Sequence, residues 1–155
     1  MANLTKRNSK MFEQVGCAYV YFTYGMYYCI NVVARSEKFN AGAVLIRGIH
    51  PMQGIDIMKR NRKKTKIDNL VNGPGKLTQA LNISIKENGY DLTKYSSLYI
   101  TNGIEIKKIH KKYRIGISKG TMKKWNFSIE KNDHLLASMA RIVQVFLSNP
   151  DEATI

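Results

Sequence analysis

Cysteine is scarce in this sequence, with only Cys17 and Cys29 among 155 residues. Their spacing fits no zinc site, and two cysteines are too few for the disulfide framework of a small secreted domain. We therefore expect a reducing cytosol as the compartment. The sequence also lacks an internal repeat, a proline-rich linker and a long low-complexity tract. These absences favour a single domain over residues 1–155.

Long hydrophobic runs are missing as well. The polar amino terminus, residues 1–7, has no apolar signal core. The longest aliphatic run of the first half, residues 43–46, is far too short to span a bilayer. The sequence therefore predicts no association with the membrane interior.

Acidic residues are few: 11 Asp and Glu face 25 Lys and Arg, which gives a net charge of +14. Such an excess predicts attraction to a polyanion, with an affinity that falls steeply as salt rises. A merely basic soluble protein and an anionic membrane surface remain as alternatives.

Aromatic residues, by contrast, are concentrated. Five of the nine tyrosines lie within residues 18–31. The pattern predicts strands over residues 17–24 and 26–34, joined by a turn at Gly25, with Tyr19 and Tyr21 on one face. An aromatic tip on a strongly basic body is suited to entering a stack of nucleic-acid bases.

Helices and strands are expected to mix without regular βαβ alternation, which predicts an α+β fold. We expect a mostly antiparallel curved sheet with a protruding β-hairpin and flanking helices. The apolar run 43–49 predicts a strand buried on both faces. Further expected elements are short helices after Pro51 and from Pro74, strands over 98–101, 113–117 and 125–129, and a helix over 133–148.

Several ordered motifs carry a resemblance to a known family. They are Thr5-Lys6-Arg7-Asn8, Tyr19-Val20-Tyr21, Tyr24-Gly25-Met26, Cys29-Ile30-Asn31, Leu45-Ile46-Arg47-Gly48, Asn72-Gly73-Pro74-Gly75-Lys76-Leu77, Arg114-Ile115-Gly116-Ile117, and Trp125 with Phe127. In this order, the sequence resembles the alkyladenine (3-methyladenine) DNA glycosylase family, the single-domain type that excises purines.

The resemblance implies a role for each of six residues. Tyr24 matches the tyrosine that enters the minor groove where a damaged base has left the stack. Tyr21 and Asn31 match base-pocket residues, and Asn31 matches the one thought to reject guanine. The pocket wall would include Ile115 and Gly116. Arg47 matches an arginine that helps to hold the attacking water and the catalytic carboxylate.

Simpler roles stay open for these residues when the family is set aside. An exposed tyrosine at a turn can be a partner contact, and Tyr21 can be core packing. Asn31 can be a satisfied buried amide. Arg47 can be the buried partner of some other acid.

The resemblance also implies a partner: double-stranded DNA that contains alkylated or deaminated purines. Candidate phosphate contacts are Lys59, Arg60, Arg62, Lys63, Lys64, Lys119, Lys123 and Lys124. No metal or organic cofactor is implied, because the family uses only water. A bacterial cytosol and association with the nucleoid are expected. The chain is expected to be a monomer, with a dimer through the 133–148 helix as the alternative.

Two segments depart from the family pattern. The family's catalytic glutamate belongs to a Glu-Ala-Tyr motif upstream of the Thr5 block, and Met1 stands only four residues before Thr5. We therefore identify no catalytic carboxylate and expect the amino-terminal part of the family domain to be missing. Glu13 and Glu37 have no evident reason to replace it. The 133–148 helix is the second departure.

Three functional hypotheses follow. The first is a DNA glycosylase with weak or absent excision. The second is a non-catalytic DNA-binding remnant or gene fragment. The third is a basic RNA-binding protein that uses the tyrosines as a stacking platform.

Overall fold

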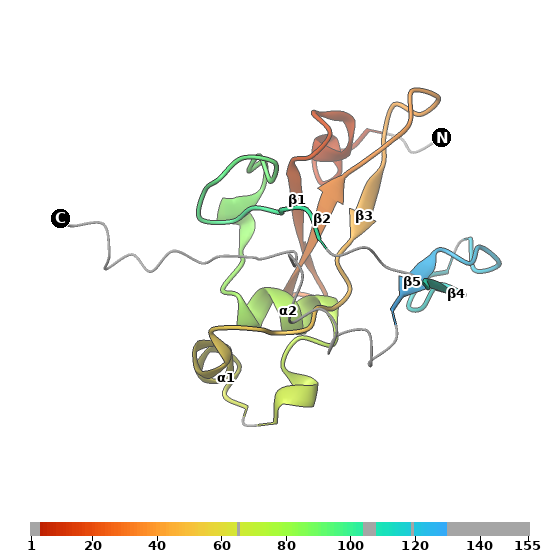
Figure 1. Cartoon of the computed structure of the whole chain (residues 1–155). Helices are drawn as coiled ribbons and strands as arrows, with labels where there is room; N and C mark the ends of the chain where they lie inside the picture. The colour runs from red at the N-terminus through yellow and green to blue at the C-terminus, as the bar shows by residue number, and fades with distance from the viewer. Residues whose placement is uncertain (1–3, 65, 104–107, 119, 130–155) are drawn as a thin grey trace. The chain divides into compact units, whose positions relative to one another are not determined.

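The computed structural model describes residues 4–64, 66–103, 108–118 and 120–129 (Figure 1). The described residues fall into two compact units, which meet in sequence between Ile100 and Thr101. Each unit is described by itself. The single domain predicted over residues 1–155 stays a prediction, and the 133–148 helix lies outside the described residues.

The first unit contains a three-stranded antiparallel sheet in the order β1-β2-β3 (Figure 1). Its strands are β1 (Ala18–Thr23), β2 (Tyr27–Val33) and β3 (Ala43–Leu45). Together with the helices, this sheet confirms the predicted α+β class and the two strands on either side of Gly25. The curvature of the sheet and the protrusion of a hairpin stay predictions.

β3 corrects one expectation. The run 43–49 was predicted to be a strand buried on both faces, but only three of its residues form a strand. Val44 is 59% exposed and Leu45 37% exposed. The physical reason is position: among the described strands β3 pairs only with β2 and lies at the edge of the sheet, so no described strand covers its other edge. An apolar run alone does not distinguish an edge strand from a central one.

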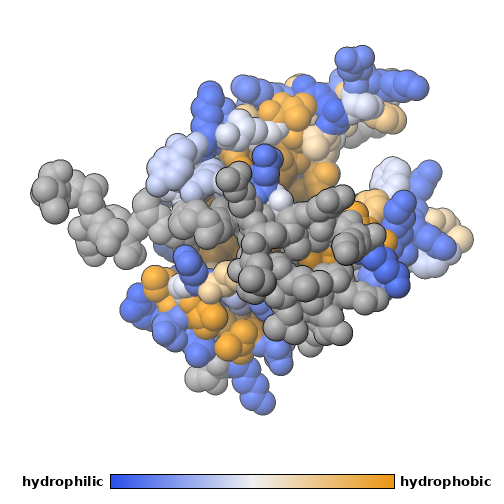
Figure 2. All heavy atoms as spheres, in the orientation of Figure 1, coloured by the Kyte–Doolittle hydropathy of each residue, from blue (hydrophilic) through white to orange (hydrophobic). Residues whose placement is uncertain are grey.

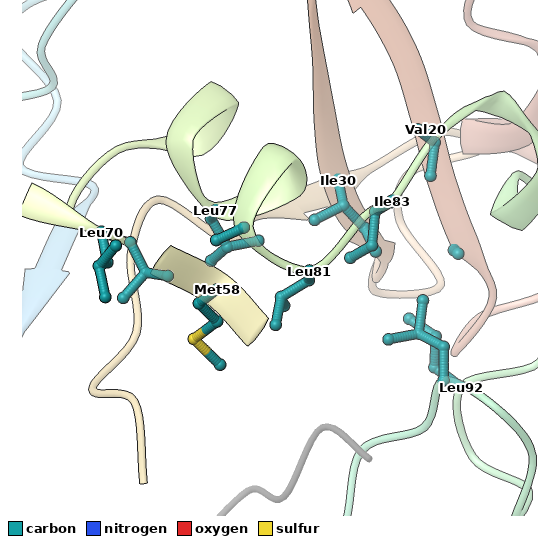
Figure 3. Close-up of a cluster of buried hydrophobic side chains, with 12 residues drawn as sticks. Val20, Ile30, Met58, Leu70, Leu77, Leu81, Ile83 and Leu92 are labelled. Carbon is teal, nitrogen blue, oxygen red and sulfur yellow. The ribbon is translucent and has the colours of Figure 1, made fainter. Parts of the chain in front are cut away.

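Helices cover part of this sheet and complete the core. The described helices are α1 (Ile55–Arg62), α2 (Pro74–Ala80) and the short 3-10 helices η1 (Ser9–Phe12), η2 (Ile67–Asn69) and η3 (Ile85–Glu87). The helices predicted after Pro51 and from Pro74 are therefore confirmed. Figure 3 shows Leu77 of α2, and Leu81 directly after this helix, near Met58 of α1, with Val20 and Ile30 contributed by the sheet.

α2 is fixed to the turn end of the β1–β2 pair (Figure 1). The Thr78 hydroxyl donates to the Tyr28 carbonyl at 2.8 Å. A Cβ on Gly75 would lie 3.0 Å from Cβ and Cγ of Tyr27, so only glycine permits this approach without a shift. The aromatic turn therefore rests on a helix that belongs to the core.

The second unit contains one antiparallel pair, β4 (His110–Lys112) with β5 (Asn126–Ser128). The strand predicted over 125–129 is confirmed in a shorter form. The strand predicted over 113–117 is wrong. Pairing with β5 begins at His110 instead, and Gly116 has a φ of +74°, which is incompatible with an extended strand.

The strand predicted over 98–101 is also wrong. Leu98 and Tyr99 are buried, as their apolar character suggests. The backbone of Ile100 donates to Leu92, but the segment joins neither described sheet. None of the helices in the described part of the chain is long and apolar enough to cross a membrane.

Candidate nucleic-acid interface

The turn between β1 and β2 presents one almost fully exposed ring. Tyr24 is 82% exposed. The backbone N–H of Met26 donates to the Thr23 carbonyl, and Tyr24 and Gly25 between them have φ of +51° and +66°. Positive φ at both central residues is typical of a type I′ turn, which normally takes Asn or Gly there. Tyr24 thus lies in the turn itself, outside the strand over 17–24 where the sequence placed it.

Two further tyrosines of β1 form a cluster with an arginine from the preceding segment. Tyr19 and Tyr21 share one strand face, as predicted, with ring centroids 5.2 Å apart and planes tilted by 36°. The Arg7 guanidinium carbon lies 4.6 Å from the centroid of the Tyr21 ring. This is a cation–π distance. Tyr19 is buried, whereas Tyr21 keeps an intermediate exposure.

Burial in this cluster favours the protonated forms of the two tyrosine hydroxyls and of the neighbouring Cys29 thiol. Burial raises the pKa of Tyr21 to about 12, and the neighbouring Cys29 and Tyr19 add to the rise while Arg7 opposes it. Burial also raises the pKa of Tyr19, against the charge and hydrogen bonding of Arg7. The pKa of the Cys29 thiol is raised by burial too. All three groups are therefore neutral at pH 7.

Asn31 faces Tyr19 across the β1–β2 ladder. It is buried, and its side-chain amide nitrogen donates to the Tyr19 carbonyl at 3.0 Å. This bond fixes the orientation of the amide. The bond also agrees with the simpler alternative, in which Asn31 is a buried amide with a hydrogen-bond partner. Asn31 therefore has a structural role, and its role in a base pocket stays a prediction.

Arg7 was missed as a site residue, although its motif was noted. The local cause of its position is a turn at Thr5–Asn8, where each residue bonds the other. The Thr5 backbone N–H donates to Oδ1 of Asn8 at 2.7 Å, and the Asn8 N–H reaches the Thr5 hydroxyl and carbonyl. The Thr-x-x-Asn spacing was the available signal, because such side chains often bond backbone groups in turns.

The other predicted pocket residues are distributed over both units. Arg47 is exposed and lies two residues after Leu45, which pairs with Asn31. Ile115 and Gly116 belong to the second unit, where Ile115 is 61% exposed. Their predicted place beside Tyr21 stays a prediction. The alternative of a buried partner is wrong for Arg47, because this side chain is exposed.

The predicted phosphate contacts of the first unit lie on α1 and the residue pair that follows it. Arg60, Lys63 and Lys64 are exposed. Arg62 is half-buried and donates to Gln79 at 2.6 Å and to the Asn69 carbonyl at 3.4 Å. Its guanidinium therefore ties α1 to α2 and η2. The Nζ atom of Lys59 lies 3.7 Å from Oδ1 of Asp56 and forms an ion pair with it.

In the second unit, lysines are interleaved with exposed rings. The Lys123 ammonium lies 5.5 Å from the centre of Trp125, and the Lys124 ammonium lies 5.5 Å from that of Tyr113. Trp125 is 62% exposed. Lys119 lies outside the described residues. Figure 2 shows hydrophilic residues along much of the rim of the face that it presents, with hydrophobic residues gathered in patches between them.

The carboxylates nearest in sequence to the aromatic strands have other surroundings. Glu13 pairs with Lys10 at 2.8 Å, and its carboxylate is about half exposed. Glu37 is exposed in the segment between β2 and β3. In the described part of the chain, no three His, Cys, Asp or Glu side chains gather closely enough to hold a metal ion.

Comparison with known proteins assigns the family. The family model for methylpurine-DNA glycosylase matches residues 1–133. An antiparallel α+β fold with a tyrosine-rich strand pair on a basic chain is in keeping with that match. The chain belongs to the methylpurine-DNA glycosylase family.

Individual relatives agree with this assignment. A protein of Prosthecochloris aestuarii is 47% identical over 134 residues, which cover 85% of this chain and 64% of the relative. A protein of Francisella tularensis is 48% identical over 135 residues, 84% of this chain and 69% of the relative. A protein of Carboxydothermus hydrogenoformans is 47% identical over 133 residues, which cover 84% of this chain and 69% of the relative. Each bears the name "Putative 3-methyladenine DNA glycosylase". The chain thus matches about two thirds of the length of these relatives.

Proposed function

We propose that this chain recognises alkylated or deaminated purines in duplex DNA by rotating the damaged base out of the helix. The observation that carries the proposal is the arrangement of one strand pair. An exposed tyrosine, Tyr24, occupies its turn, and a partly exposed tyrosine, Tyr21, and a fixed amide, Asn31, lie a few residues away.

Base rotation costs roughly a few kcal/mol of lost stacking and pairing. A ring that fills the vacated position offsets part of this cost. Tyr24 suits that role because its side chain is almost free of protein contacts and its backbone is set in the left-handed region. Strain at an exposed residue of this kind is common at functional sites.

The pocket role of Tyr21 and Asn31 follows from their chemistry. The Tyr21 ring offers a stacking surface, and its phenol stays protonated at pH 7. Asn31 is held by the Tyr19 carbonyl, so its position is defined before a base arrives. We propose that this amide meets the exocyclic amino group of guanine and so disfavours it.

Affinity for undamaged DNA would come from charge. With a net charge of +14, the chain attracts phosphates whatever their sequence. If about six phosphates are contacted, the logarithm of the binding constant falls with the logarithm of the salt concentration at a slope of roughly −5. Arg60, Lys63, Lys64, Lys123 and Lys124 are the described candidates.

Excision requires a further group. Hydrolysis of the glycosidic bond needs a general base within about 3 Å of the attacking water. Glu13 is paired with Lys10, and Glu37 is solvent-exposed. These placements favour a second candidate function for this chain: lesion binding with little or no excision.

Two measurements on the purified chain test the proposal. Fluorescence anisotropy compares a duplex containing 1,N6-ethenoadenine with the same duplex containing adenine and with single-stranded RNA. The proposal requires the lesion duplex to bind most tightly, and equal binding to both duplexes would sink it. Preference for the RNA would favour the RNA-binding alternative. Release of 3-methyladenine from methylated DNA then separates an enzyme from a binding protein, with a longer family member assayed in parallel.

A further inference from the structure

We propose that Arg7 is a specificity-determining residue that makes the Tyr21 pocket favour neutral damaged purines over cationic ones. The proposal rests on the proposed function, because base rotation is what would bring a purine to the Tyr21 ring. Alkylation at a ring nitrogen can leave a purine with a positive charge, whereas deamination and etheno adducts leave it neutral. The two classes of lesion therefore differ in how they respond to a nearby cation.

The geometry around Tyr21 leaves a limited approach. The Arg7 guanidinium lies over one face of the ring, 4.6 Å from its centroid. The Tyr19 ring lies beside it at 5.2 Å. Cys29 is the cross-strand partner of Tyr21. A base that stacks on Tyr21 with this cluster intact uses the ring face opposite Arg7.

Arg7 forms no ion pair with a carboxylate of the described residues. The ion pairs of the described residues join Lys10 to Glu13, Lys59 to Asp56 and Lys94 to Asp91, and Arg7 takes part in none of them. The Thr5–Asn8 turn directs the chain so that Arg7 reaches back over β1. The cation beside the pocket is thus not neutralised by a described carboxylate.

A cation on one face of an aromatic ring weakens the attraction between the opposite face and a second cation. The ring quadrupole already attracts the guanidinium, and the two positive charges repel each other across the ring. A base stacked about 3.5 Å beyond the ring lies about 8 Å from the guanidinium carbon. At this separation, the repulsion weakens the binding of a cationic base about 2-fold if the dielectric is that of bulk water, and about 30-fold if it is that near a protein surface. Because Arg7 is exposed and its charge is partly screened by solvent, we expect it to weaken the binding of a cationic base about 3- to 10-fold.

Three variants of the full chain test the proposal. Arg7→Gln removes the charge and keeps a planar amide, whereas Arg7→Lys keeps the charge. Lys6→Gln is the matched control, because it removes the same charge from the adjacent exposed residue. Dissociation constants are measured by anisotropy on duplexes that contain 1-methyladenine, which is cationic at neutral pH, or 1,N6-ethenoadenine, which is neutral.

The readout is the ratio of the two dissociation constants, cationic lesion over neutral lesion. Arg7→Gln should lower this ratio about 3- to 10-fold, while Arg7→Lys and Lys6→Gln leave it unchanged. A purely structural role of Arg7, or simple attraction of phosphates, would shift both constants together, and an unchanged ratio in Arg7→Gln therefore overturns the proposal. If the native chain does not distinguish either lesion duplex from undamaged DNA, the proposed function fails, and this inference fails with it.

Discussion

The substitution Tyr24→Gly separates the role of the exposed ring from the stability of the turn that carries it. Tyr24 has a φ of +51° and an exposure of 82%, so its side chain contributes little packing to the folded chain. A non-glycine residue in this region costs about 1–2 kcal/mol. Glycine removes that strain but has about 0.5–1 kcal/mol more backbone entropy to lose on folding. The free energy of unfolding should therefore stay constant or rise by up to about 1.5 kcal/mol.

Binding should change in the opposite direction. A tyrosine that stacks in the vacated position of a duplex contributes about 1–3 kcal/mol, so the lesion duplex should bind about 5- to 150-fold more weakly. Urea unfolding measures the first quantity and anisotropy with 1,N6-ethenoadenine duplex the second. The substitution Tyr95→Ala is the control, because Tyr95 is 88% exposed and lies away from the β1–β2 turn. Unchanged lesion affinity in a stable Tyr24→Gly protein would refute the reasoning.

Three further predictions concern the support of the site. Asn31→Leu should lower the free energy of unfolding by about 0.5–1.5 kcal/mol, measured in urea, because it removes the hydrogen bond from the side-chain amide to the Tyr19 carbonyl. Gly42→Ala should cost about 1–3 kcal/mol by the same assay, since its Cβ would lie 2.5 Å from the Ala34 carbonyl oxygen; native stability would contradict this close approach. Hydrogen bonds from Thr93 lower the pKa of Asp91 from 3.8 to about 2. The stability they provide is present above pH 3.8 and is lost as the pH falls through about 2. The melting temperature of Asp91→Asn should therefore be lower than native at pH 7, and the difference should shrink as the pH falls toward 2.

The sequence predicted the part of the fold whose periodicity is strong. The alternation of Tyr19, Val20 and Tyr21 identified β1 and placed two rings on one face, because side chains of a strand alternate strictly. Pro74 and the spacing of Leu77 and Leu81 identified α2 for the corresponding reason in a helix. These features depend only on local spacing.

Features that depend on neighbours in space were missed. The apolar run at β3 suggested burial, but burial also requires a strand or helix on each side, which a local pattern does not contain. The shift of β4 to His110 was hidden for a similar reason, since its register is set by β5. Arg7 escaped notice as a site residue because its role comes from a turn that returns it to Tyr21, fourteen residues later in the chain.

The central claim is that a damaged base leaves the duplex and is replaced by the ring of Tyr24. It is tested most directly by the fluorescence of 2-aminopurine placed beside an ethenoadenine in the duplex. A neighbouring base that leaves the stack unquenches 2-aminopurine, so the native chain at saturation should raise its fluorescence and Tyr24→Gly should raise it much less. Unchanged fluorescence with saturating native protein would contradict the account.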